Sequence, residues 1–496
     1  MADTEPTAGT ATATETLPIL DRILVEGHMA RDDSQQAHAK DLLSEFVDQI
    51  LAEGQTVAND VVQAINDRIA AIDDLISAQL NEVMHHQDFQ KLESTWRGMH
   101  YLVMNSETST RLKIRVLNAS RPELQKDLEK AVEFDQSVLF KKLYEEEYGT
   151  FGGNPYSCLI GDFEFGRHPQ DVAFLEKMSQ VAAAAHAPFI GGVSPKMFDM
   201  DSWLELMNPR DLSKIFESTE LVKWRSFRES EDSRYVALTL PRWLVRLPYG
   251  PETVPVEDVN FVEDVDGRDH SRYLWGNPVW VMAQRITNAF ALYGWTAAIR
   301  GVEGGGKVEG LPAHTFPTDD GDIALKCPTE IAITDRREKE INDLGFISLC
   351  HCKGTDYAAF FGGQTANKPK VYNLDSANAN ARLSSMLPYM LNVSRFAHYL
   401  KVIMRDKIGS FMTASNVSSY LNTWITNYVL LDDNAQQSIK AAYPLREARI
   451  DVTEVPGKPG VYNATVFLRP HFQLEELTAS IRLVAELPPP SATRGA

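Results

Sequence analysis

The stretch "YSCLIGDF", Tyr156 to Phe163, decides the fold when it is read together with the residues after it. A helical pattern from about Asp171 to Ala187 leads to "APFIGGV", Ala187 to Val193, a second short apolar run. Strand, helix and strand in this order predict a βαβ unit, in which parallel strands are joined by a helix that covers the sheet. "SRYVALTL", Ser233 to Leu240, predicts a further strand. The expected fold class is α/β, with a mixed, largely parallel sheet and helices.

A long amphipathic helix is predicted upstream of this unit, behind Asn59 or Asp60, either of which is suited to cap its first turn. Its apolar residues recur at three- and four-residue steps: Val62, Ile65, Ile69, Ile72, Ile76, Leu80 and Val83. Between this helix and the βαβ unit, "RLKIRVL" (111–117) alternates apolar residues and predicts a strand. Ser120 and Glu123 then have the spacing of a capping box, so we expect a helix to begin there.

Downstream, "NPVWVMAQRITNAFALYG" (277–294) predicts a helix that Gly294 ends, and a different pattern begins near residues 370 to 376. Three helical segments are followed by "REARIDVTEV", the turn "PGKPG" and "VYNATVFLRP", which predict a β-hairpin. Its second strand directs one set of side chains the same way: Tyr462, Ala464, Val466 and Leu468. A last strand, "SIRLVAEL" (480–487), is expected before the terminal prolines.

The N-terminal part contains a short apolar segment that has no local partner. "LPILDRILV" (17–25) reads as a strand with Leu17, Ile19, Ile23 and Val25 on one side, although its apolar spacing also allows one helical turn. The expected organisation is a disordered tail (1–16), a linking strand and tether (17–58), an α/β domain (59–374) and a C-terminal domain (375–496).

The composition narrows the possible classes of function. Of 496 residues, 68 are acidic and 49 are basic, and the resulting net charge of -19 disfavours nucleic acid and anionic membrane surfaces as partners. The N-terminus lacks the pattern of a secretory signal, and no apolar run is long enough to span a membrane. We therefore expect a cytoplasmic protein, and four cysteines in so long a chain suit a reducing compartment.

One motif points to nucleotides. Gly301, Gly306 and Lys307 have the G-x-x-x-x-G-K spacing of a phosphate-binding loop, but Val308 stands where a Ser or Thr would bind magnesium. Gly310 and Pro312 follow and disfavour the helix that such a loop requires. A flexible surface turn is the preferred interpretation, and a nucleotide-binding enzyme is the alternative.

Other candidate chemistry is weak. Cys350 and Cys352 form one pair where a structural zinc site needs two, and adjacent His85 and His86 diverge on a helix. The acids in "YEEEYG" and "GDFEFG" offer paired carboxylates without an identifiable base, and the charges of "RFAHYLKVIMRDK" are best read as a solvated helix face. No catalytic residue, cofactor or metal ion is predicted.

Several long stretches together resemble one family. They are "HHQDFQKLESTWRGMHYLV", "EEEYGTFGG", "SFRESEDSRYVALTLPRWLVRLPYG", "GGGKVEGLPAHTF", "NANARLSSMLPYM", "SRFAHYLKVIMRDKIGSF" and "RPHFQLEEL". They look like the large sheath subunit of the bacterial type VI secretion system (TssC/VipB/EvpB), over about residues 20 to 490.

The resemblance implies a structural protein with a core like that of contractile phage tail sheaths. It implies pairing with a small sheath subunit (TssB/VipA-like), helical polymerisation with copies of itself around an Hcp-like inner tube, attachment to a baseplate, and contraction that delivers effectors. It also implies recycling by the unfoldase ClpV, mainly through the small subunit. Terminal strands complete the sheets of neighbouring subunits in such sheaths, which assigns partner binding to ten residues: Leu17, Ile19, Ile23, Val25, Ile450, Val452, Tyr462, Ala464, Val466 and Leu468. Another cytosolic scaffold is the remaining alternative.

Overall fold

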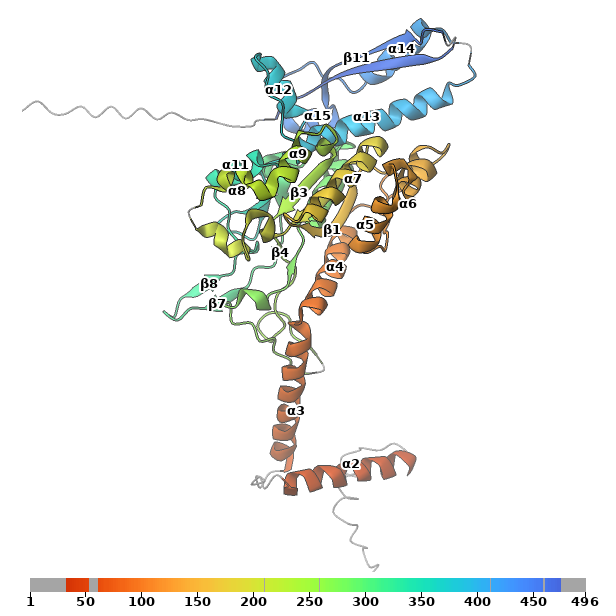
Figure 1. Cartoon of the computed structure of the whole chain (residues 1–496). Helices are drawn as coiled ribbons and strands as arrows, with labels where there is room; N and C mark the ends of the chain where they lie inside the picture. The colour runs from red at the N-terminus through yellow and green to blue at the C-terminus, as the bar shows by residue number, and fades with distance from the viewer. Residues whose placement is uncertain are drawn as a thin grey trace, which may run out of the picture. The chain divides into compact units, whose positions relative to one another are not determined.

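A computed structural model describes residues 33–52, 61–208, 210–257, 259–410, 412–457 and 460–473 (Figure 1). The chain forms two compact units, Met1–Ala78 with Asp258–Phe261, and Gln79–Glu257 with Val262–Ala496. Helix α2 (Asp33–Ala52) covers most of the predicted polar tether, which is therefore partly helical. Helix α3 (Val61–Met84) confirms the predicted amphipathic helix. The predicted strand 17–25 lies outside the described residues, and the proposed domain boundaries stay a prediction.

A six-stranded mixed sheet forms the centre of the larger unit. Its strand order is β1 (Leu159–Phe165), β2 (Phe189–Val193), β3 (Val236–Leu240), β9 (Ile347–His351), β10 (Ala358–Phe360) and β6 (Lys307–Val308). The first four strands are parallel, and β10 is antiparallel to both β9 and β6. The βαβ prediction and the mixed α/β fold class are confirmed.

Helices cover both faces of this sheet because its inner strands are apolar on both sides. Helix α7 (Pro169–Ala185) packs with Phe189 and Val193 of β2, whereas α10 (Val279–Tyr293) packs with Ile190 of the same strand. The two layers make separate apolar clusters on the two faces. This accounts for the unbroken apolar runs in the sequence of these strands.

The predicted strand at 111–117 is wrong. Residues 112–120 contain no strand, and side chains fix the segment instead: Arg115 contacts Glu147 and Tyr156, and Lys113 donates to Asn154 at 3.1 Å. Apolar residues do alternate in this segment, but a strand also needs a second strand to pair with, and none lies beside this segment among the described residues. The capping box that follows is present, since Glu123 accepts hydrogen bonds from the Ser120 backbone and hydroxyl at the start of α5 (Arg121–Lys130).

The C-terminal module consists of helices followed by a two-stranded sheet, as predicted. Helices α12 (Asp375–Leu383), α13 (Leu387–Asp406) and α14 (Ala414–Thr426) precede strands β11 (Leu445–Glu454) and β12 (Tyr462–Pro470). A short helix, α15 (Gln437–Ala442), was not predicted. The expected last strand at 480–487 lies outside the described residues.

The other elements complete the larger unit. Besides several short helical turns, they are α4 (Gln87–Met104), α6 (Val138–Phe140), η2 (Lys141–Tyr148), α8 (Leu212–Glu217), α9 (Val222–Glu229), α11 (Asp335–Asp343), β4 (Trp243–Leu244), β5 (Trp275–Gly276), β7 (Thr315–Pro317) and β8 (Ile323–Leu325). None of the helices in the described ranges combines the length and the apolarity that crossing a bilayer requires.

Candidate subunit-docking hairpin

The β11–β12 hairpin carries six of the ten residues predicted to bind partners. The turn uses Gly457 and Gly460, both at φ +80°, a conformation that side chains disfavour. Ile450 lies opposite Val466 and Val452 lies opposite Ala464 in an antiparallel register. Even-numbered side chains therefore share one face, and Ile450, Val452, Val466 and Leu468 join an apolar cluster there. The predicted facing is confirmed, whereas the partner-binding role stays a prediction.

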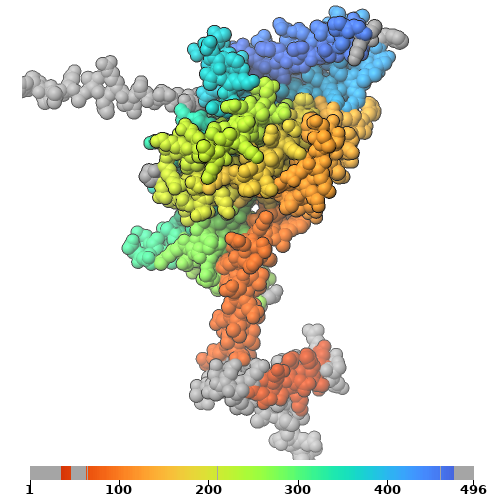
Figure 2. Space-filling view, in the orientation of Figure 1, coloured from red at the N-terminus to blue at the C-terminus, as the bar shows by residue number. Residues whose placement is uncertain are grey.

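Helices α13 and α14 form an aromatic platform beneath the hairpin. Phe396 is fully buried and stacks on Trp295 with ring centroids 4.4 Å apart. Trp424 and Tyr428 approach it edge-on at 6.2 and 5.7 Å. Figure 2 shows the C-terminal strands, in blue, on the outer side of this module. Within the described part of the chain, one face of the hairpin thus packs on this cluster, and the other face exposes side chains such as Phe467.

Two cations tie the second half of α13 to the segment 144–150. Lys401 Nζ lies 3.6 Å from the centroid of the Tyr148 ring and donates to the Tyr144 hydroxyl at 3.2 Å. Arg405 donates to the backbone carbonyls of Tyr148 and Thr150, each at 2.7 Å. The prediction of a solvated helix face is therefore wrong for these two residues, because their charges meet a surface about 250 residues earlier in the chain.

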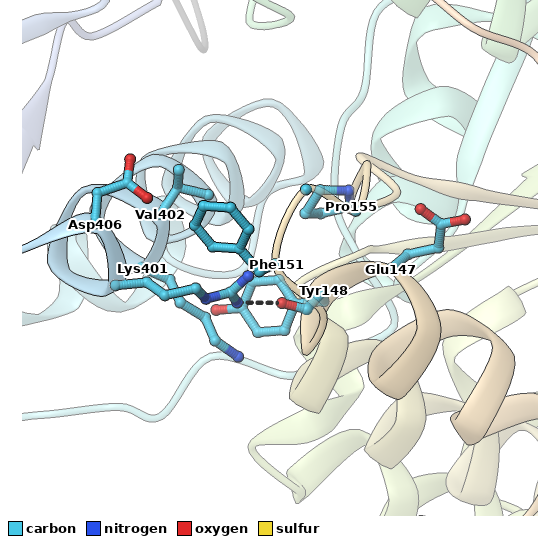
Figure 3. A pocket seen from close by; sticks show the side chains of 10 residues that line it. Glu147, Tyr148, Phe151, Pro155, Lys401, Val402 and Asp406 are labelled. Atoms are coloured by element: carbon cyan, nitrogen blue, oxygen red, sulfur yellow. Dashed lines mark hydrogen bonds between the residues drawn. The ribbon is translucent and has the colours of Figure 1, made fainter. Parts of the chain in front are cut away.

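A small pocket lies beside these contacts (Figure 3). It holds about 220 Å³ between the loop after Tyr148 and helix α13, and exposed Phe151 lines it with Val402 and Pro155. Glu147 at its rim is engaged by Arg115. The pocket therefore lies between the loop after Tyr148 and helix α13, which Lys401 and Arg405 already join.

His398 is the buried titratable group of this junction. Its Nε2 donates to the Ala185 carbonyl at 2.9 Å, and its ring lies 5.1 Å from Tyr148 and 6.2 Å from His186. Burial lowers the pKa of His398 to about 4; the hydrogen bond to Ala185 opposes this shift, and the charges of His186, Arg395 and Lys401 add to it. The native protein therefore holds this histidine neutral.

We expect this burial to make stability depend on pH. The unfolded state binds a proton below its ordinary pKa of about 6.5, and the folded state binds it only near 4, so stability is full above pH 6.5 and falls between these values. Lowering the pH from 7 to 4.5 should cost about 2–3 kcal/mol through this group. His398→Gln, whose amide keeps a donor for Ala185, should reduce the loss by that amount in urea unfolding. Equal losses in both proteins would contradict the assignment.

The glycine-rich loop does not have the geometry of a phosphate-binding loop. Its N–H groups are used internally, since Gly306 donates to the Gly301 carbonyl at 2.8 Å and Gly301 donates to that of Phe360 at 2.7 Å. Lys307 enters strand β6 rather than a helix and contacts Glu309 and the Tyr357 ring. A Cβ on Gly306 would lie 2.6 Å from the Phe360 carbonyl oxygen, so the turn is tightly packed rather than flexible.

The other candidate groups are occupied by structural contacts. Glu164 binds Arg242 through two hydrogen bonds of 2.6 and 2.7 Å, and Asp162 accepts from Thr95 at 2.5 Å. Cys350 is buried, and burial raises the pKa of its thiol to about 12. Cys352 lies just beyond strand β9 and is only partly buried.

Sequence comparison identifies relatives across nearly the whole chain. Residues 66–367 match the EvpB/VC_A0108 tail sheath N-terminal domain, and residues 376–487 match the EvpB/VC_A0108 tail sheath gpW/gp25-like domain. The type VI secretion system sheath protein TssC1 of Pseudomonas aeruginosa is 51% identical over 488 residues, which cover 98% of each protein. Structures of the anti-feeding prophage baseplate and of its contracted helical sheath align at 10% identity, with TM-scores of 0.34 and 0.31. They cover 63% and 62% of this chain and 66% of each matched chain.

Proposed function

The chain belongs to the EvpB/VC_A0108 family of tail sheath proteins, and we infer that it is the structural large subunit of a type VI secretion contractile sheath. The observation that carries this inference is 51% identity to a sheath protein over 98% of the chain. Copies of the chain assemble into a polymer, and the sequence motifs that resembled an enzyme are engaged in packing.

We propose a specific set of partners for this subunit. A small sheath subunit pairs with it in the cytoplasm, an Hcp-like tube fills the polymer, and a baseplate anchors one end. An unfoldase of the ClpV type recycles the contracted sheath, mainly through the small subunit. Contraction needs no hydrolysis by this chain, because many subunits each releasing a few kcal/mol on repacking supply the work together.

The ends of the chain supply the links between subunits in this proposal. Among the described residues, β11 and β12 form a two-stranded sheet by themselves, and the segment Leu17–Val25 has the apolar alternation of a strand. Adding a strand satisfies main-chain groups that an open edge leaves unpaired and joins subunits by main-chain hydrogen bonds. The length of chain before the larger unit gives this link the reach that rotating subunits need.

Co-expression with the neighbouring small subunit tests the proposal. The wild-type pair should form long tubules by electron microscopy. Prolines at both Ile19 and Ile23 should abolish tubules and leave the heterodimer intact, because proline cannot donate to a shared strand ladder. Tubules of normal length from this variant would refute the linking role, and a protein that stays monomeric with and without the small subunit would refute the sheath function.

A further inference from the structure

Cys327 is a free thiol that lies two residues after strand β8 and is only partly buried. The backbone on both sides of it is held by hydrogen bonds. On one side, Lys326 N–H donates to the His314 carbonyl at 2.7 Å. On the other side, Leu244 N–H donates to the Pro328 carbonyl at 2.8 Å. The sulfur is therefore fixed in position, while small molecules in the solvent have access to it.

The thiol meets a histidine from the central sheet. His351 is the last residue of strand β9, and its side chain forms a hydrogen bond with Cys327. Thr329 Oγ1 lies 3.2 Å from the Cys327 sulfur. A hydroxyl rotates to suit its partner, so the Thr329 hydroxyl, which also reaches the Ile331 carbonyl at 2.9 Å, turns its hydrogen to the sulfur when the sulfur is charged. The sulfur thus has a base and a hydroxyl as neighbours.

The turn after β9 fixes which ring nitrogen of His351 carries the hydrogen. His351 Nε2 lies 2.8 Å from the Thr355 carbonyl, which only accepts, so Nε2 donates and Nδ1 keeps a lone pair. Thr355 is itself held, because its N–H and its hydroxyl both donate to the Cys352 carbonyl, at 3.2 and 2.6 Å. Nδ1 is therefore the atom that takes a proton from Cys327.

These contacts favour the charged form of both side chains. Burial raises the pKa of the Cys327 thiol, but hydrogen bonds from His351 and Thr329 and the charge of His351 outweigh burial and hold that pKa below its ordinary value. The hydrogen bond to Cys327 in turn raises the pKa of His351, and burial opposes this shift. A thiolate is the reactive form of cysteine, and an adjacent imidazolium stabilises it.

A lysine adds positive charge near the sulfur. Lys326 Nζ lies 4.6 Å from the centroid of the Tyr273 ring. Asp266 and Asp269 interact with the same ammonium, so its charge is shared between two carboxylates and the thiolate. Lysine and aspartate ordinarily keep their charges at neutral pH. The cysteine and the histidine therefore set how the reactivity of the thiol changes near neutral pH.

We propose that Cys327 is a reactive thiol that small hydroperoxides oxidise, with His351 as its base. The thiolate sulfur attacks one peroxide oxygen, so that an S–O bond forms while the O–O bond breaks, and the leaving oxygen takes the proton from His351 Nδ1. The sulfur loses two electrons and becomes a sulfenic acid, and the peroxide gains them and becomes water or an alcohol. This site goes beyond the sheath function and uses no residue of the β11–β12 hairpin.

Alkylation of the full chain by iodoacetamide tests the thiolate directly, because the thiolate and not the thiol reacts. Peptide mass spectrometry follows each cysteine separately. Cys352 is the matched control, since it is also a partly buried free thiol and strand alternation directs it away from His351. At about pH 6.5, Cys327 should react about five- to tenfold faster than Cys352. The two rates should become equal in urea, and equal rates in the folded chain would overturn the proposal.

The variant His351→Gln tests the base. Its amide keeps a donor for the Thr355 carbonyl but takes no proton from the thiol. The alkylation rate of Cys327 should fall about five- to tenfold at about pH 6.5, and its pH profile should move upward by about one pH unit. An unchanged profile in the folded variant would refute the role of His351. If the variant does not fold, the wild-type profile decides, because a Cys327 rate that rises only together with that of Cys352 refutes the pair.

Trapping with dimedone tests the oxidation. The full chain is treated with hydrogen peroxide in the presence of dimedone, which reacts with sulfenic acids, and the adducts are located by peptide mass spectrometry. We expect the adduct at Cys327 in excess over Cys352, and a smaller amount at Cys327 in His351→Gln. Absence of an adduct at Cys327, or an equal amount at both cysteines, would overturn the assignment of hydroperoxides.

Discussion

Replacing Arg246 by methionine is expected to lower the free energy of unfolding by about 3–5 kcal/mol, the cost of removing one partner from a buried ion pair. The Arg246 side chain is 9% exposed and that of Glu263 is 1% exposed. Arg246 donates to Glu263 at 2.6 and 3.1 Å and to Glu93 of α4 at 2.7 Å. Without Arg246, buried Glu263 would lose its arginine partner and keep the Tyr249 N–H and nearby His85, whereas Glu93 would keep Arg97.

The electrostatics of Glu93 show what the arginine contributes. Burial raises the pKa of Glu93, but hydrogen bonds and charges from Arg246 and Arg97 outweigh burial and hold that pKa below its usual value. This network ties α4 to the segment between β4 and α10, both within the larger unit. We therefore expect the loss to affect the folding of the unit rather than one loop.

Arg97→Met is the matched control. Arg97 binds the same Glu93 oxygen at 2.7 Å, but its side chain is 40% exposed, and exposed pairs usually contribute no more than about 1 kcal/mol. Urea unfolding of both variants measures the difference. If Arg246→Met lowers the free energy of unfolding no more than Arg97→Met does, burial does not determine how much these ion pairs stabilise the protein. Adding Glu263→Gln to Arg246→Met should recover part of the loss by removing one uncompensated charge.

Local patterns were sufficient for the centre of the fold. Strands β2 and β3 are buried on both faces, so their apolar runs could only belong to a covered sheet, and the helix between β1 and β2 required a parallel crossover. The hairpin could also be predicted, because its turn glycines and the alternation of apolar residues in its strands both indicate a hairpin. In these places the local preference and the tertiary environment agree.

Contacts between segments that are distant in the sequence could not be predicted. The segment 111–117 alternates like a strand, yet its side chains are held by residues near 150 and its backbone pairs with none of the described residues as a strand would. Lys401 and Arg405 resembled ordinary surface charges because Tyr148, which they contact, lies about 250 residues away. Helix α4 was not predicted as an element, although it is as amphipathic as α3.

The candidate site was only partly predictable for the same reason. Alternation identified which hairpin residues share a face, but the support of β11 also depends on Asn422, whose side chain reaches the Ile450 backbone from α14. An asparagine in a helix gives no sign of this in sequence. Residues 17–25, the other half of the predicted interface, lie outside the described residues and stay a prediction.

Replacing Phe396 by alanine should destabilise the β11–β12 hairpin and leave the stability of the central six-stranded sheet unchanged. Phe396 is fully buried among Trp295, Trp424 and Tyr428, and removing a buried phenylalanine typically costs about 3–5 kcal/mol. Because this cluster supports β11 and β12, the cost should appear as local opening of the C-terminal module. Hydrogen exchange at β11 and β12 amides that pair within the hairpin should accelerate by about two to three orders of magnitude, with exchange in β2 and β3 unchanged.

The comparison with Tyr399→Ala gives this experiment its control. Tyr399 lies on the same helix and touches the same rings, at 6.4 Å from Trp295 and 6.1 Å from Trp424, but it is 39% exposed. Its loss leaves little cavity, so we expect a small change in exchange. Acceleration spread equally over β2, β3 and the hairpin in Phe396→Ala would show that the larger unit unfolds as one. Confinement to the hairpin would mean that the docking element has a stability of its own, which a sheath needs if strands are to remain paired while the subunits around them move.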